Sequence, residues 1–140
     1  MLKVQPLVYV CRRMEKLMKN KPTILVVEDD IALNEAYMTI LKTTYSSVFT
    51  AFNGEEALQV AEQCNPDVIF LDLRMPVLDG IGFLEKYKPA ELHPDVCIVV
   101  FSNYDMQTEV DKAYELGAER YVLKALATPS SLLKIVNDLS

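Results

Sequence analysis

The chain has 140 residues, of which 51% are hydrophobic and 24% charged, a composition typical of one globular domain and not of a disordered chain. No apolar run approaches the ~18 residues of a membrane-spanning helix, and the three cysteines show no CxxC spacing, so we expect a cytoplasmic protein without disulfides or structural zinc. The net charge of −6 at pH 7 argues against direct nucleic-acid binding and leaves proteins and cations as the natural partners.

The first 20 residues form a basic segment that differs from the rest of the chain. Residues 1–21 contain six Lys/Arg and one acidic residue, whereas the remaining residues contain eight Lys/Arg and 19 acidic residues. Two explanations are open for residues 1–20. They are either an extraneous start, with Met18 beginning the functional chain, or a segment that docks on the acidic body or on a second protomer. Residues 21–140 are expected to form one domain, with no second domain following.

From Lys21 onward, short apolar runs alternate with helical patterns, which is typical of βαβ units around a parallel sheet. The predicted strands are Thr23–Val27, Ser47–Phe52, Asp67–Leu71, Val96–Phe101 and Arg120–Leu123. Five helices alternate with them. The predicted fold class is therefore α/β, a doubly wound five-stranded parallel sheet of order 2-1-3-4-5 with helices on both faces.

The helices are recognised by the signals at their ends. Asp30 caps the first, whose apolar face is Leu33, Ala36, Tyr37, Ile40, Leu41 and Thr44. Asn53 caps the second, and a short third helix runs from about Gly82 towards Tyr87. The fourth runs from about Met106 to Leu116 before Gly117, and Thr128-Pro129 opens the last. The only histidine, His93, precedes Pro94 in a loop and is expected to face solvent.

Two of the predicted strands end in acidic residues. The first runs into Glu28-Asp29-Asp30 and the third into Asp72. Ligands of open parallel sheets bind at the carboxyl ends of the strands where the strand order reverses, and the first and third strands are neighbours at that point. The last two strands end at Ser102 and Lys124, which are expected to reach the same crevice from its other side.

Converging carboxylates repel one another, and burial increases the cost, so a divalent cation among them is the reasonable arrangement. Oxygen ligands without His or Cys select a hard ion such as Mg²⁺, or Mn²⁺ in its place. A carboxylate beside such an ion can attack phosphorus and form an aspartyl phosphate. Lys124 would then supply a mobile positive charge, and the Ser102 hydroxyl would bond a phosphoryl oxygen.

Five motifs in chain order resemble those of response-regulator receiver domains of two-component signalling, over about Lys21 to Ser140. The resemblance implies metal binding by Glu28, Asp29, Asp72 and the backbone carbonyl of Arg74, with Asp72 as the phospho-acceptor. It implies phosphoryl-binding and switch roles for Ser102, Tyr121 and Lys124. Arg74 and Tyr104 fall at the variable positions that tune how fast water attacks the phosphoaspartate.

The same resemblance implies a phosphorylation-controlled signalling switch and not an enzyme. A sensor histidine kinase or phosphotransfer protein would donate the phosphoryl group to Asp72 in a Mg²⁺-dependent reaction. The surface of the fourth helix, the fifth strand and the fifth helix would then change for binding of a downstream protein target. We expect a stand-alone receiver, either a monomer or a phosphorylation-dependent dimer.

Several positions depart from the family pattern. Ala125 follows Lys124 where relatives usually have proline in a cis peptide, and we predict a trans bond because a cis non-proline bond costs about 2.5–4 kcal/mol. Asn103 follows Ser102 where relatives usually have a smaller residue, which affects access to the phosphoryl group. The bulky Arg74 and Tyr104 predict a shielded phosphoaspartate that hydrolyses slowly.

Three other functions are weighed against this one. A flavodoxin-type cofactor module would share the fold, but the acidic loop after the first strand would repel flavin phosphate. A phosphatase with an aspartate nucleophile usually carries a second acid two residues later, where this chain has Arg74. A degenerate receiver that binds partners without phosphorylation is favoured by Asn103 and Ala125, and it is opposed by the retained Glu28, Asp29, Asp72, Ser102 and Lys124.

Overall fold

Five parallel strands form one sheet in the computed structural model, which describes residues 21–103 and 106–139. The strands are β1 (Thr23–Val27), β2 (Ser47–Ala51), β3 (Val68–Asp72), β4 (Cys97–Ser102) and β5 (Arg120–Leu123). Their order in the sheet is β2-β1-β3-β4-β5, so the predicted order is confirmed. The basic segment 1–20 lies outside the described residues.

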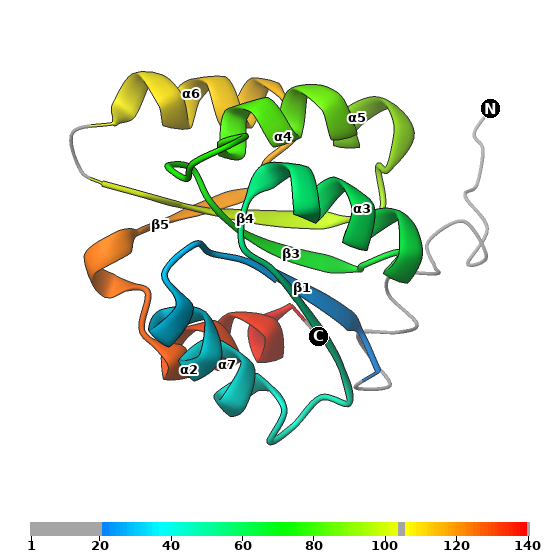
Figure 1. Cartoon of the computed structure of the whole chain (residues 1–140), viewed down its shortest axis with the longest axis vertical. Helices are drawn as coiled ribbons and strands as arrows, with labels where there is room; N and C mark the ends of the chain where they lie inside the picture. The colour runs from blue at the N-terminus through cyan, green and yellow to red at the C-terminus, as the bar shows by residue number, and fades with distance from the viewer. Residues whose placement is uncertain (1–20, 104–105, 140) are drawn as a thin grey trace, which may run out of the picture.

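Helices cover both faces of this sheet (Figure 1). They are α2 (Ile31–Leu41), α3 (Gly54–Cys64), α4 (Gly80–Tyr87), α5 (Pro89–Leu92), α6 (Gln107–Glu115), α7 (Pro129–Asp138) and the 3₁₀ turn η1 (Lys124–Leu126). One face carries α3, α4, α5 and α6, and the other carries α2 and α7. Within the described ranges, none of these helices has the length and apolar character needed to cross a membrane.

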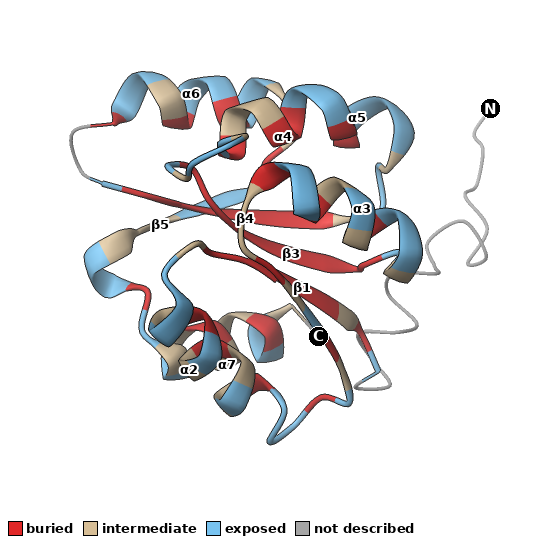
Figure 2. Ribbon diagram, viewed as in Figure 1, coloured by how far each residue is buried: buried red, intermediate tan, exposed pale blue. Residues whose placement is uncertain are grey.

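The core consists of two clusters separated by the sheet. Along β1, Leu25 and Val27 pack in the cluster beneath α3, α4 and α6, whereas Ile24 and Val26 pack in the cluster beneath α2 and α7. This alternation follows from the two-residue period of a strand, and both faces are apolar because both are covered. Figure 2 shows the consequence, since β3 and β4 are buried along their whole length.

Three strands have boundaries that differ from prediction by one residue, and the shifts of two of these strands affect the site. The strands β3 and β4 each begin and end one residue later than predicted, so Asp72 and Ser102 are the last residues of their strands. Asp72 is paired with Phe101 in the sheet ladder, which fixes its backbone more firmly than a loop would. The strand β2 ends at Ala51, because the carboxylate of Glu56 takes the N–H of Phe52.

The helix predictions were right in number of main helices but wrong at several ends. The cap of α2 is Asp30 as predicted, yet the helix ends at Leu41, which leaves Thr44 exposed and buries Tyr45 instead. Helix α4 begins at Gly80, two residues earlier than predicted, because the carboxylate of Asp79 accepts the N–H of Gly82 at 2.8 Å. The predicted helix stop before Gly117 is confirmed by its φ of +121°.

Two short elements and one histidine contact were not predicted. Helix α5 follows α4 directly, because Lys88 takes a left-handed conformation and Pro89 starts a new turn. The 3₁₀ turn η1 follows β5. The expectation that His93 faces solvent was wrong, since its ring is half-buried and stacks on Tyr87 with centroids 4.0 Å apart.

Candidate functional site

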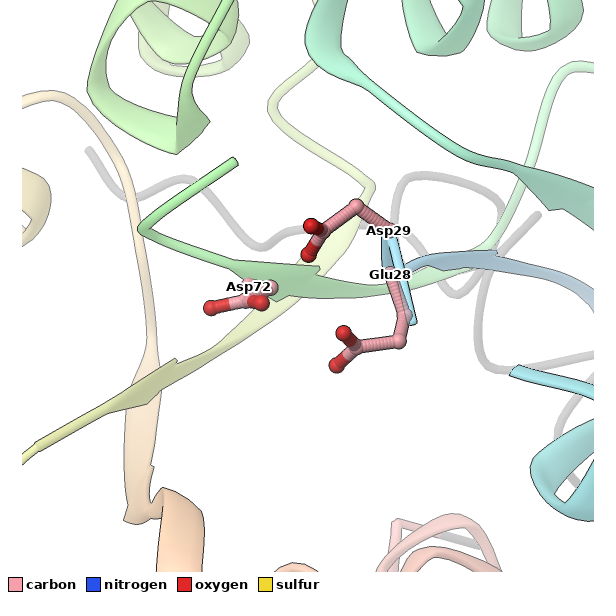
Figure 3. Close-up of side chains that lie close together, drawn as sticks. All are labelled: Glu28, Asp29 and Asp72. Carbon is pink, nitrogen blue, oxygen red and sulfur yellow. The ribbon is translucent and has the colours of Figure 1, made fainter. Parts of the chain in front are cut away.

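Three carboxylates meet at the carboxyl ends of β1 and β3. Glu28 and Asp29 follow β1, Asp72 ends β3, and one oxygen of each lies within 4.8 Å of the others. Figure 3 shows the side chains converging from the two neighbouring strands. Glu28 and Asp72 are buried and Asp29 is partly exposed, so the cluster opens to solvent on one side. Asp30 turns away as the exposed cap of α2, as predicted.

Lys124 reaches this cluster from the end of β5. Its Nζ lies 2.5 Å from Oδ2 of Asp72 and 3.1 Å from Oε1 of Glu28. The two contacts join residues that are 52 and 96 positions apart in the sequence. The peptide bond after Lys124 is trans, as predicted, and the described ranges contain no cis peptide bond.

A buried asparagine that sequence analysis missed supports the acidic end of β1. The Asn34 side chain donates to the carbonyl oxygen of Glu28 at 2.9 Å and to that of Ala51 at 3.3 Å, and it accepts the hydroxyl of Thr50. Asn34 is 1% exposed, so these bonds replace water. The one available signal was a polar residue on the apolar side of a predicted helix, four residues after its cap.

The backbone around Asp72 is closely packed. Its Oδ1 accepts the N–H of Arg74 at 3.2 Å. A Cβ on Gly80 would lie 2.6 Å from the carbonyl oxygen of Asp72, so only glycine fits where α4 begins beneath the site. In the loop between them, Val77 is 76% exposed and has a φ of +71°. Such a φ is unfavourable for a β-branched residue, and it marks this loop as strained.

Burial dominates the electrostatics of the site. It raises the pKa of Glu28 to about 7, and the charge of Asp72 adds to this effect. The N–H of Asp30, 3.0 Å from Glu28 Oε2, and the ammonium of Lys124 oppose it. Burial acts to lower the pKa of Lys124, but its contacts with Asp72 and Glu28 outweigh burial and raise this pKa. One ammonium therefore sits among three acidic groups.

This donor set fits a hard divalent cation. The three groups offer only oxygen ligands, one ammonium cannot neutralise three carboxylates, and the partly exposed Asp29 leaves a path from solvent. None of these three residues is His or Cys, the ligands that softer metals prefer. Glu28, Asp29 and Asp72 are therefore the residues that would hold Mg²⁺.

Two of the predicted phosphoryl-binding and switch residues, Ser102 and Tyr121, lie on β4 and β5. Ser102 is buried at the end of β4, where it pairs with Leu123, and its hydroxyl has no hydrogen-bond partner among the described residues. A buried hydroxyl without a partner costs free energy, which a phosphoryl oxygen would offset. Tyr121 is 41% exposed on the edge strand β5, outside the acidic cluster.

The two residues predicted to tune the phosphoryl lifetime differ in what can be described. The Arg74 side chain is 64% exposed, and its Nε lies 3.5 Å from Oε1 of Glu109 on α6. The guanidinium thus links the loop after Asp72 to the first turn of α6. Tyr104 lies outside the described residues.

Comparison with known proteins agrees with this geometry. Residues 24–137 match the response regulator receiver domain family. The nitrate/nitrite response regulator protein NarL of Escherichia coli is 34% identical over 118 residues, which are 83% of this chain and 53% of NarL. A protein-glutamate methylesterase/protein-glutamine glutaminase of Nitratidesulfovibrio vulgaris is 36% identical over 120 residues, 84% of this chain and 32% of that protein. The chain spans about half or less of the length of these curated relatives.

Solved structures share the fold over most of the chain. Chemotaxis protein CheY4 of Vibrio cholerae is 25% identical with a TM-score of 0.75, covering 86% of this chain and 99% of that one. A receiver domain of a Francisella response regulator is 28% identical with a TM-score of 0.71, covering 84% and 95%. With this sheet order, the acidic cluster at its carboxyl edge and a family match over most of its length, the chain belongs to the response regulator receiver domain family.

Proposed function

We propose that this receiver takes a phosphoryl group onto Asp72 from a sensor histidine kinase or a phosphotransfer protein, in a reaction that depends on Mg²⁺. The observation that carries the proposal is the position of the Asp72 carboxylate. It lies buried at the end of β3, beside Glu28 and Asp29 and 2.5 Å from the ammonium of Lys124. The ammonium that would offset the charge of an incoming phosphoryl group, and the carboxylates that would hold a divalent cation, therefore surround one nucleophile.

The chemistry follows from these groups. A carboxylate oxygen of Asp72 attacks phosphorus, the bond from phosphorus to the donor nitrogen breaks, and its electron pair stays on the donor's imidazole. Bound Mg²⁺ would offset the charge of the transferring oxygens. Lys124 shifts from its contact with the Asp72 carboxylate to a phosphoryl oxygen, and Ser102 donates its hydroxyl to another. We infer that the backbone carbonyl of Arg74 completes the metal ligands.

The output of the switch is proposed to be the surface of α6, β5 and α7. Tyr121 is 41% exposed on β5, and Ser102 is the last residue of β4, which precedes α6 in the chain. Bonding of Ser102 to a phosphoryl oxygen would draw the end of β4 towards the site, and the neighbouring strand β5 with Tyr121 would then change its exposure. A downstream protein would bind the changed surface, with the receiver acting either as a monomer or as a phosphorylation-dependent dimer.

One experiment tests the acceptor directly. Wild-type protein and Asp72→Asn are incubated with acetyl phosphate, with Mg²⁺ or with EDTA, and the intact mass is measured. We expect an increase of about 80 Da, one phosphoryl group, in the wild type with Mg²⁺ only. The Asn variant keeps the size of the side chain and removes its nucleophilic oxygen pair, so it should stay unmodified.

The alternative outcomes separate the competing functions. Absence of the adduct in wild-type protein with Mg²⁺ would support a degenerate receiver that binds its partners without phosphorylation. An adduct that forms equally in Asp72→Asn would assign the acceptor to another residue. A similar yield in EDTA would show that the carboxylates act without a metal ion.

A further inference from the structure

Lys124 is held in place although the segment that carries it has little burial. It begins η1, at the end of the edge strand β5, whose Arg120 and Tyr121 are exposed. Leu126, in the same turn, is 63% exposed. Hydrophobic packing of the turn itself therefore does little to set where the lysine starts. A lysine side chain is long and flexible, so the position of its backbone decides which carboxylate it can reach.

A tyrosine on α2 holds the backbone of this turn in place. Tyr37, on α2, is fully buried with its ring 5.8 Å from that of Phe101. Its hydroxyl donates to the carbonyl oxygen of Ala127 at 2.5 Å. Ala127 is itself buried, and its N–H donates to the carbonyl oxygen of Lys124 at 3.1 Å, which closes the turn. Two consecutive hydrogen bonds thus run from α2 to the backbone of the lysine.

The hydroxyl is well suited to this task. Burial raises the pKa of Tyr37, and the nearby charges of Glu28 and Asp72 add to the effect, so the group stays protonated and donates. Its acceptor is a backbone carbonyl that no water would reach, since both partners are buried. Such a bond holds the turn in a way that an exposed one could not.

We propose that Tyr37 is a positioning residue, which holds the turn of Ala127 so that the Lys124 ammonium stays on Asp72. This inference rests on the proposed phosphorylation of Asp72. The simpler explanation of the bond between Tyr37 and Ala127 is that any buried tyrosine hydroxyl needs an acceptor, whatever that acceptor's role. The chain offers a control for that explanation: Tyr45, which follows the end of α2, is 2% exposed and donates to Oδ1 of the exposed Asn137, also at 2.5 Å.

The test compares Tyr37→Phe with Tyr45→Phe, since each removes one buried hydroxyl and keeps the ring. Amide hydrogen exchange of Ala127 reports on the turn, calorimetry on Mg²⁺ affinity, and mass spectrometry on the rate of phosphorylation by acetyl phosphate. We expect Tyr37→Phe to speed the exchange of Ala127 and to slow phosphorylation, each by about five- to tenfold, the value of one buried hydrogen bond. The Mg²⁺ affinity of Tyr37→Phe should stay within about twofold of wild type, because the proposed metal ligands lie at the ends of β1 and β3 and not in the turn.

Tyr45→Phe should leave all three measurements within about twofold of wild type, although each variant loses one tyrosine hydrogen bond of the same length. Equal effects of the two variants on phosphorylation and on the exchange of Ala127 would overturn the proposal. So would a slower reaction in Tyr37→Phe with an unchanged Ala127 amide. If wild-type protein takes up no phosphoryl group, the proposed function fails, while the Ala127 amide still decides whether Tyr37 holds the turn.

Discussion

Replacing Glu28 by Gln is expected to remove most of the pH dependence that the acidic cluster adds to the stability of the metal-free protein. Burial raises the pKa of Glu28 from 4.5 to about 7 in the folded state. The folded protein therefore keeps a proton on this group over a range of pH in which the unfolded chain has lost it. Its contribution to stability is fully present below about pH 4.5 and is lost as the pH rises through about 7.

The size of the effect follows from the same shift. A pKa that rises from 4.5 to about 7 corresponds to about 3 kcal/mol of unfolding free energy, since one pKa unit is worth about 1.4 kcal/mol. Glu28 is fully buried, so solvent screening reduces this value little. Gln has the shape of the protonated acid and does not titrate. The difference in stability between the two proteins should therefore change by about 3 kcal/mol in favour of the Gln variant between pH 4.5 and pH 8.

Urea unfolding followed by circular dichroism, in EDTA at several pH values, measures this difference. Glu35→Gln is the matched control, because it removes one acidic group from the exposed side of α2. Adding Mg²⁺ at pH 8 should stabilise wild-type protein more than Glu28→Gln, since a bound cation neutralises the buried carboxylate. A stability difference between wild type and Glu28→Gln that stays constant from pH 4.5 to pH 8 would refute the reasoning, as would equal slopes for both Gln variants.

Three further predictions concern residues around the site. Asn34→Ala should lower the unfolding free energy by about 1–3 kcal/mol in urea titrations, because it leaves the buried carbonyl of Glu28 without the amide donor and the hydroxyl of Thr50 without its acceptor. A smaller loss would show that water replaces the amide. Gly80→Ala should destabilise by about 1–3 kcal/mol and slow phosphorylation, because its Cβ would press on the backbone of Asp72, and an unchanged melting temperature would contradict this packing. Arg74→Ala should change the unfolding free energy by less than about 1 kcal/mol, because its ion pair with Glu109 is exposed. The same variant should shorten the lifetime of the phosphorylated form, and an unchanged lifetime would count against shielding by Arg74.

Much of the fold could be predicted because its elements are defined locally. The apolar runs of β1, β3 and β4 are short and alternate with helical segments. The helix caps Asp30, Asn53 and Thr128 all accept the hydrogen bonds expected of caps. The errors occur where a tertiary contact decides an end. Pairing in the sheet extends β3 to Asp72. Helix α5 forms because Lys88 takes a left-handed backbone conformation, and the identity of a lysine does not predict that conformation.

The candidate site could be predicted in composition but not in arrangement. Glu28, Asp29, Asp72 and Lys124 were identified because they directly follow the first, third and fifth predicted strands, and parallel strands bring their carboxyl ends to one edge. Asn34 and the hydroxyl of Tyr37 were missed. Both lie on a helix face that predicts core packing, and neither has a partner close in the sequence.

The sequence by itself determined the class of fold, the order of its elements and which acidic groups could act together, because these depend on periodicity and on local end signals. Only the tertiary structure decided the electrostatics of the site. The raised pKa of Glu28 requires its burial beneath neighbouring elements, and the contact of Lys124 with Asp72 requires η1 to be held against α2. Burial and long-range contact are properties of packing, so no local pattern of residues encodes them.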